Sequence, residues 1–513
     1  MLKVVKIISS SPFLIPVLLF LGAFFIYSYN LEGQPWHPDE INYLGWAGNY
    51  IYLVNHGFFG NSCLLSIDDC NMLYHIPAHG ATYSPIRMLL IGIPMSWKNS
   101  DSGDFYNWSC YWFSCYHPDK APTISQMGAG RTLSPLFGAL TVMISFLVGR
   151  VLFSKYTGIV VAFLFLFYDL WLWYSRTIMV EVHYVFFSML TLLILLYAVK
   201  SEQIKIKYLV LAAITYGFAL TSKLMSVEFS VLFAVIIFIV NLSKRKNVKK
   251  QTVKSGLAIV LFFLLSGTVF LLTEPGFYKN PIGQIVSMKD DMDNYNRDVW
   301  FIGYPNVQGL QPVRILALSQ YTLFPSLINY HASEPAMKVE ANYSWNNPPT
   351  YSTIPISLFF FIGFAYIVNR IRKLKECLPE VIMLVWFVST FVYSLLIPRD
   401  FSLERYLLPL LISIIFISAY GFWNFIKMIS YHKTKIVFSA SLIITHAITT
   451  LFYWQKIYYS YGTFWFNPLR FGTFQQSIEN ILPLTINLVF LVFFGLMVVL
   501  KFQKHAKHSR MIQ

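Results

Sequence analysis

Two adjacent carboxylates, Asp39 and Glu40, stand beside His37 in residues 36–43, Trp-His-Pro-Asp-Glu-Ile-Asn-Tyr. A carboxylate in such a position can act as a general base that takes the proton from a hydroxyl group. The same segment also fits an ordinary helix start, because Asp caps exposed backbone N–H groups and acidic residues suit the positive end of the helix dipole. Taken alone, these residues leave helix capping and catalysis equally open.

Further charged residues lie within or at the ends of apolar runs, where a charge is energetically costly and therefore informative. They are Arg176, Glu181, Lys223, Glu228 and Arg405, with His183 nearby. We expect all of them to lie at one depth, near the same membrane surface as the first motif. The cations there suit a phosphate or diphosphate leaving group. A carboxylate at the same depth suits deprotonation of an acceptor hydroxyl.

Structural interpretations of these residues stay open beside the chemical one. Arg176 also fits the role of an anchor that extends its charged end to the membrane surface. Glu181 also fits a partner of Arg176 across a turn, and Lys223 also fits an ordinary loop lysine. His37 and His183 are weak candidates for metal ligands. The spacing Glu181-x-His183 puts its two side chains on different faces of a helix, which is poor spacing for a metal. The sequence therefore identifies no cofactor, and a divalent cation stays open.

The elements that must position these residues are membrane helices. The chain has 513 residues, of which 56% are hydrophobic and 12% are charged. Apolar runs long enough to cross a bilayer recur along it, so we expect an all-α polytopic membrane protein with about twelve transmembrane helices. Pro85 and Pro94 bracket or interrupt a shorter apolar piece, Ile86–Trp97, which we interpret as an interfacial or re-entrant helix. The predicted spans are 12–29, 132–152, 157–174, 178–198, 207–221, 226–242, 255–273, 353–369, 380–397, 403–425, 436–454 and 481–500.

The loops alternate in charge. Lys and Arg gather in the short loops and tails on one side, where Glu202, Glu376 and Glu380 are the accompanying acids. The net charge of +15 therefore reflects the positive-inside pattern and not a nucleic-acid partner. We predict cytoplasmic N- and C-termini, a cell-membrane location and an extracytoplasmic site.

We expect two large extracytoplasmic loops, 30–130 and 274–352, within a core domain of residues 1–425. Residues 426–513 then supply C-terminal transmembrane helices and a basic cytoplasmic tail.

Four cysteines, Cys63, Cys70, Cys110 and Cys115, fall in the first outer loop, and Cys377 stands alone on the inner side. Four cysteines in one non-cytoplasmic loop favour two disulfides, with Cys63–Cys70 and Cys110–Cys115 the simplest of three pairings. Free thiols and a four-ligand metal site are the alternatives. The spacing within each pair is unlike the two-residue spacing of zinc sites, so disulfides are favoured.

Several of these stretches together resemble one known family. Residues 38–43, after the first span, resemble the signature of the GT-C glycosyltransferases, and most closely the protein O-mannosyltransferase and aminoarabinose-transferase-like branch. Residues 131–153 are similar to the second span of that branch, and Tyr174-Ser175-Arg176 with Glu181 to its short loop carrying a second acid. Residues 220–223 are similar to its lysine turn, and residues 404–409 to its late Arg-Tyr element before a proline. The resemblance covers about residues 10–425 in order.

The resemblance implies a GT-C fold and a hexosyl- or pentosyltransferase that takes sugar from a polyprenyl-phosphate donor. Asp39 would be the catalytic base or its close equivalent. Glu40 would bind the acceptor or orient the site, and Glu181 would position the acceptor or a cation. The expected reaction is an inverting transfer to an acceptor hydroxyl on the extracytoplasmic face.

The resemblance also implies contacts to the donor phosphate from Lys223 and Arg405 and, more weakly, from Arg176. Two features depart from the family. Glu181 stands where Asp is more usual, and residues 56–125 match no pattern of the family. The acceptor is therefore open between protein, lipid and glycan.

A transporter or flippase of a lipid-linked or anionic solute is the alternative function, because intramembrane charges fit that class too. The two large outer loops and the confinement of charge to the outer half argue against it, since alternating access needs polar groups around the midplane. A non-catalytic scaffold of the same fold is a third possibility, which Asp39 and Lys223 argue against.

Overall fold

The structure is a computed structural model. It describes residues 13–32, 40, 43–45, 47–48, 51, 85–97, 124–200, 205–242, 248–274, 282–283, 286, 354–372, 377–396, 408–429, 434, 438–441 and 447. Within these residues all regular structure is helical and no strand is present, as predicted. The helices are α2 (Leu14–Ser28), α7 (Pro85–Trp97), α8 (Ile124–Arg131), α9 (Ser134–Leu152), α10 (Lys155–Leu166), α11 (Asp169–Tyr174), α12 (Glu181–Lys200), α13 (Ile206–Ser222), η4 (Leu224–Phe229, a 3₁₀ helix), α14 (Ser230–Leu242), α15 (Val248–Thr273), α18 (Ile354–Arg372), α19 (Leu378–Leu396) and α20 (Leu408–Met428).

In the part of the chain that the structure describes, four helices are long and apolar enough to cross a membrane by length and composition. They lie at Ser125–Leu152, Glu181–Ala198, Gln251–Thr273 and Leu408–Met428. Shorter apolar helices, α2, α13 and α19 among them, coincide with other predicted spans. The chain is thus a helical membrane protein, and the total of about twelve spans stays a prediction. The predicted spans 436–454 and 481–500 lie largely or wholly outside the described residues.

The predicted single span 157–174 is wrong in one respect, because it consists of two helices. α10 ends at Leu166, and α11 begins at Asp169 after Tyr168, whose backbone is extended. The hydroxyl of Tyr27 in α2 donates a hydrogen bond to the Leu166 carbonyl across 3.1 Å, which satisfies a carbonyl left open by the break. The predicted span 226–242 likewise begins as the 3₁₀ helix η4 before α14.

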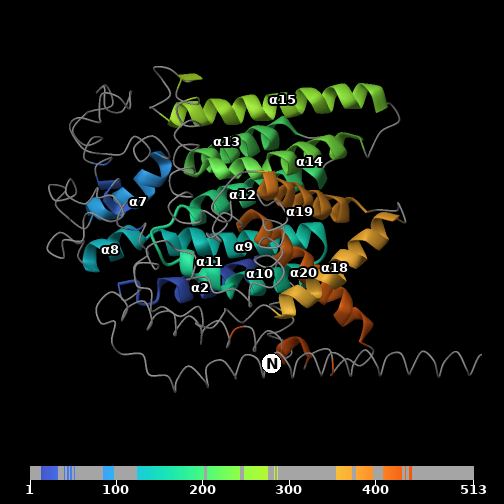
Figure 1. Ribbon diagram of the computed structural model, residues 1–513, viewed down its shortest axis with the longest axis horizontal. Helices are drawn as coiled ribbons and strands as arrows, with labels where there is room; N and C mark the ends of the chain where they lie inside the picture. Colours follow the sequence, from blue (N-terminus) through green and yellow to red (C-terminus); the bar gives the residue numbers. More distant parts are fainter. Residues whose placement is uncertain are drawn as a thin grey trace, which may run out of the picture.

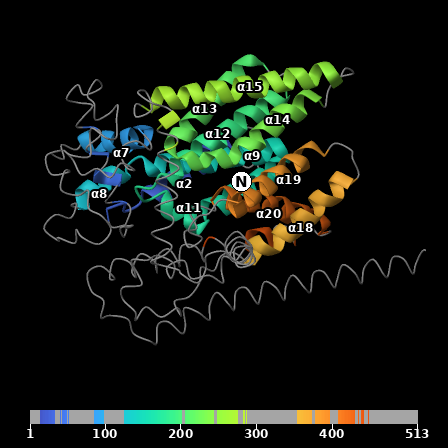
Figure 2. The ribbon, with the colours of Figure 1, turned by 45° about the horizontal axis from the view of Figure 1, so that its top comes forward.

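The helices form a bundle with two distinct ends. α2, α9, α12, α13 and α15 run roughly parallel, and α7 and α8 lie together at one end of them in both views (Figures 1 and 2). We call this end the site end, because the chain brings to it the segment after α2, the connection between α11 and α12, and the turn after α13.

The opposite end is basic. It includes Arg150, Lys155 and Lys427 at the adjoining ends of α9, α10 and α20, where Tyr156 stacks on Trp423 with ring centroids 4.6 Å apart. We call it the basic end. These cations belong to the loops that the sequence assigns to the inner side.

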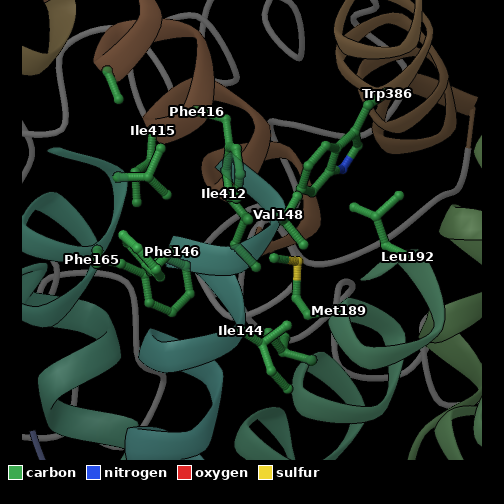
Figure 3. Close-up of a cluster of buried hydrophobic side chains, with 14 of the residues drawn as sticks. Ile144, Phe146, Val148, Phe165, Met189, Leu192, Trp386, Ile412, Ile415 and Phe416 are labelled. Carbon is green, nitrogen blue, oxygen red and sulfur yellow. The ribbon is translucent and has the colours of Figure 1, made fainter. Parts of the chain in front are cut away.

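The core lies where α9, α10, α12, α19 and α20 meet (Figure 3). Met189 of α12 lies among side chains of α9, and Trp386 of α19 packs on Phe416 of α20 with ring centroids 5.1 Å apart. By contrast α15 turns a row of large apolar side chains outward, including Leu257 and Leu264. An outward apolar face suits contact with lipid.

A second, smaller apolar cluster joins α7 and α8 to the chain around residues 36–43, which we call the motif segment. Its buried members are Leu44, Ala47, Met88, Ile91, Met95, Met127, Ala129 and Ile178. The predicted piece 86–97 is therefore confirmed as a helix, and its apolar side packs on Leu44 and Ala47. A Cβ at Gly92 would meet the backbone oxygen of Ala47 at 2.9 Å and the side chain of Ile51, so only glycine allows this close approach.

Candidate functional site

The C-terminal end of α2 directs the chain into the motif segment. Asn30 has a positive φ of 49°, a left-handed conformation that Asn tolerates better than most residues and that often ends a helix. Arg176, fully buried, donates to the carbonyls of Ile26 at 2.8 Å, Tyr27 at 3.1 Å, Tyr29 at 2.5 Å and Asn30 at 3.4 Å. Its positive charge also suits the negative end of the α2 dipole. Arg176 thus joins the C-terminal end of α2 to the connection between α11 and α12.

Glu40 is fully buried and holds two distant parts of the chain together. Its Oε1 accepts from Arg131 Nε at 2.8 Å and from the backbone N–H of Ile178 at 2.6 Å, while its Oε2 accepts from Arg131 Nη2 at 2.6 Å. Arg131 also donates from Nη1 to the Leu31 carbonyl at 2.8 Å. This bidentate pair therefore ties the motif segment to the end of α8 and to the turn before α12.

Glu181 begins α12 and pairs with Lys223 from the turn after α13. Lys223 Nζ lies 2.5 Å from Glu181 Oε1, with Glu181 fully buried and the lysine side chain 18% exposed. The ammonium also faces the Tyr184 ring at 5.9 Å from its centroid. Partial exposure leaves this ammonium reachable by a ligand, and a lysine has three donor hydrogens to share.

A continuous set of contacts links three of the predicted motifs. Glu40 bonds to Ile178, Glu181 follows three residues later, and Glu181 pairs with Lys223. Glu228 of η4, also predicted for this depth, is buried five residues after Lys223.

Asp39, His37 and Arg405 lie outside the described residues, and so do Cys63, Cys70, Cys110 and Cys115. Their predicted roles and pairings stay predictions.

Sequence reasoning missed two charged groups of the site end, Arg87 and Glu274. Arg87 of α7 is nearly buried, and its guanidinium carbon lies 4.6 Å from the Tyr43 ring centroid. Glu274 follows α15 and is buried; burial raises the pKa of its carboxyl group well above the usual 4.5, and the charge of Arg87 partly offsets this. A single arginine inside an apolar run and an acid at the end of one are the signals that could have revealed them.

The described residues do not fit a resident metal ion. Among them no group of three or more His, Cys, Asp or Glu side chains is arranged to hold one. His183 instead packs edge-on against Phe137, with ring centroids 5.0 Å apart.

Residues 109–277 match the family model described as dolichyl-phosphate-mannose-protein mannosyltransferase. Over this stretch the chain is similar to the protein mannosyltransferases, which agrees with the resemblance that the motifs predict. Arg131, Arg176, Glu181 and Lys223 lie inside the matched stretch, whereas residues 36–43 precede it. No curated protein sequence matches the chain significantly.

Similar solved structures include the oligosaccharyltransferase of Archaeoglobus fulgidus in the apo form, with 14% identity and a TM-score of 0.48. They also include the archaeal oligosaccharyltransferase AglB from the same organism in complex with an inhibitory peptide and a dolichol-phosphate, with 13% identity and a TM-score of 0.46. A third is the complex of the Archaeoglobus fulgidus oligosaccharyltransferase with Zn and sulfate, with 14% identity and a TM-score of 0.46. The alignments cover 85% of this chain and 52–55% of those chains, so the chain spans about half of their length.

Proposed function

We propose that this protein is a glycosyltransferase that moves a sugar from a polyprenyl-phosphate carrier to an acceptor hydroxyl at the site end of the bundle. The observation that carries the proposal is the linked set Glu40–Ile178 and Glu181–Lys223, which gathers acids and a reachable cation at one end of an apolar bundle. Site chemistry of this kind at the end of membrane helices suits a lipid carrier whose apolar body stays in the bilayer. The family model that matches residues 109–277 names a lipid phosphate sugar donor.

The proposed roles follow from what each group can do. Asp39, adjacent to the anchored Glu40, takes the proton of the acceptor hydroxyl. The hydroxyl oxygen then attacks the anomeric carbon as the bond from that carbon to the phosphate oxygen breaks. This single displacement inverts the configuration, and the bonding pair leaves with the polyprenyl phosphate. Lys223 and Arg405 stabilise that anion.

Glu40 and Arg176 have different proposed tasks. The oxygens of Glu40 accept hydrogen bonds from Arg131 and Ile178, so we assign Glu40 the task of orienting the motif segment. Arg176 donates to backbone carbonyls at the end of α2 and so serves the same purpose from the other side. Glu181 holds the Lys223 ammonium in place and lies close enough to it to position an acceptor as well.

The acceptor and the side of the membrane belong to the proposal too. A hydroxyl of a protein is the favoured acceptor, because the matched family acts on proteins by its description. We place the site end outside the cytoplasm, since the basic end carries the inner-side charge.

The test is transfer of labelled sugar from a lipid carrier by purified protein in detergent, comparing the natural chain with Asp39→Asn. The variant keeps the size of the side chain and removes the base, so transfer should be lost while the protein still folds, as judged by thermal unfolding. A transporter would transfer no sugar in either form. Full transfer by Asp39→Asn would overturn the assignment of the base.

A further inference from the structure

The turn that carries Lys223 is joined to the bundle by Tyr216, which lies about two helical turns earlier in α13. Tyr216 is 1% exposed, and its hydroxyl lies 3.2 Å from the Ser226 carbonyl oxygen and 2.5 Å from the Ser230 hydroxyl. Ser226 belongs to η4, and Ser230 begins α14. One tyrosine therefore connects α13 to both of the helices that follow Lys223.

The direction of each hydrogen bond follows from the atoms involved. A carbonyl oxygen only accepts, and a tyrosine hydroxyl has a single hydrogen to give. Tyr216 therefore donates to the Ser226 carbonyl and accepts from the Ser230 hydroxyl. Both bonds end on the Tyr216 oxygen, so removal of this one atom breaks the whole connection.

The Tyr216 ring is held by helices other than its own. Phe262 of α15 stacks on it with ring centroids 5.6 Å apart, and Phe233 of α14 meets it edge-on at 5.0 Å. The helices α13, α14 and α15 lie side by side in both views (Figures 1 and 2). The position of the Tyr216 hydroxyl is therefore set by the packing of three helices.

The turn after α13 depends on such support. η4 is a 3₁₀ helix of six residues, a type of helix whose hydrogen-bond geometry is poorer than that of an α-helix. Leu224 and Val227 are exposed on it. The Ser226 N–H donates to the Lys223 carbonyl across 3.0 Å. The residue whose carbonyl accepts from Tyr216 is thus itself bonded to the backbone of Lys223.

We propose that Tyr216 is a positioning residue that holds the Lys223 ammonium where the phosphate of the lipid carrier binds. The inference rests on the proposed function, in which Lys223 stabilises that phosphate, and adds the group that fixes the place of the lysine. The contacts run from the Tyr216 hydroxyl through the backbone of Ser226 to Lys223. A displaced ammonium stabilises a phosphate less, because electrostatic stabilisation depends on charged groups that are already in place.

The experiment measures the Kd of dolichyl phosphate for the full-length protein in detergent. Tyr216→Phe removes the hydroxyl and keeps the ring between Phe233 and Phe262, so the fold should be retained, as judged by thermal unfolding. We expect this variant to bind about three- to tenfold more weakly, the usual effect of losing one or two hydrogen bonds. Lys223→Met removes the ammonium itself and should weaken binding further.

The double variant, Tyr216→Phe with Lys223→Met, separates positioning from general damage. A tyrosine that acts through the ammonium has no further effect once the ammonium is absent, so the double variant should bind as Lys223→Met does. A tyrosine that only supports the fold would lower the affinity by the same factor on both backgrounds.

Further variants match these changes. Ser230→Ala breaks the second bond and should weaken binding less than Tyr216→Phe does, whereas Ser230→Thr keeps a hydroxyl and should retain more of the affinity than Ser230→Ala. Tyr366→Phe makes the same substitution at a tyrosine of α18, whose hydroxyl donates to Met428 Sδ at 3.0 Å, and should leave the Kd unchanged. If Tyr216→Phe does not fold, Ser230→Ala takes its place in the double variant.

The outcomes are distinct. Natural affinity in Tyr216→Phe, or an equal further loss on the Lys223→Met background, would overturn the positioning role and leave the proposed function standing. Natural affinity in Lys223→Met would contradict the assignment of Lys223 to the phosphate, and the positioning role with it. Failure of the natural chain to bind dolichyl phosphate would contradict the proposed function itself.

Discussion

At the scale of single residues, the neighbouring acids Asp39 and Glu40 show how one short motif can divide its work. Glu40 accepts from Arg131 through both oxygens and from the Ile178 backbone, so its charge is already neutralised inside the protein. A base needs a proton-accepting oxygen that the substrate can reach. We therefore expect catalysis at Asp39 and anchorage at Glu40, a task for Glu40 that differs from the helix capping considered for the motif.

Glu40→Ala should destabilise the protein by about 3–5 kcal/mol, because it leaves the Arg131 guanidinium buried without its counter-charge. The measurement is the free energy of unfolding in detergent by chemical denaturation. Arg370→Ala is the comparison: its guanidinium pairs with Glu380 at 3.3 Å but is 49% exposed, so the expected loss is smaller, about 0–1 kcal/mol. A Glu40 variant of full stability that has lost transfer would instead indicate a direct role in the reaction.

At the scale of elements, α7 is the support on which the motif segment depends. Its apolar side joins Leu44 and Ala47 in one buried cluster, and Gly92 lets the two helical pieces approach closely. Arg87 on the same helix faces Tyr43. The position of the motif is therefore set by packing between elements and not only by the local sequence.

Gly92→Ala tests this dependence. The added Cβ meets the Ile51 side chain and the Ala47 carbonyl, so α7 or the motif segment must shift, at a cost of about 1–3 kcal/mol for overpacking. We expect lower kcat in the transfer assay together with a lower thermal midpoint. Gly256→Ala, where a Cβ has nothing within 4 Å, is the matched control and should keep natural activity and stability. Natural activity in Gly92→Ala would show that α7 does not position the motif.

The sequence predicted elements best where the apolar run was long and uninterrupted. The helices α9, α12, α18 and α19 lie close to their predicted spans. The break between α10 and α11 was missed although Asp169, where α11 begins, is a charged residue within the otherwise apolar residues 157–174. The bond from Tyr27 of another helix to Leu166, which supports the break, could not be predicted. A contact between distant parts of the chain leaves no local pattern.

At the scale of the whole molecule, the same limit governs the site. Periodic alternation of spans was enough to place Glu40, Glu181 and Lys223 at one end, as the structure shows. It could not show that Glu40 meets Arg131, 91 residues away. Depth in a membrane follows from hydropathy, whereas lateral neighbours follow from packing.

The orientation of the whole bundle gives the last prediction. Cys377 begins the connection into α19 at the basic end and is partly exposed as a free thiol. Because that end carries the excess of Lys and Arg, it should face the cytoplasm. In a variant with Cys63, Cys70, Cys110 and Cys115 changed to Ser, a membrane-impermeant maleimide should label Cys377 only after cells are permeabilised.

Leu224, 39% exposed in η4 at the site end, provides the complementary position. Adding Leu224→Cys to a chain that also carries Cys377→Ser should give labelling in intact cells, because the site end then faces outward. The two variants are expected to respond oppositely to permeabilisation. Labelling of Cys377 after permeabilisation shows that this thiol is accessible, so its protection in intact cells reflects the membrane and not burial in the protein. Labelling of Cys377 in intact cells, with Leu224→Cys protected, would place the site in the cytoplasm and contradict transfer on the outer face.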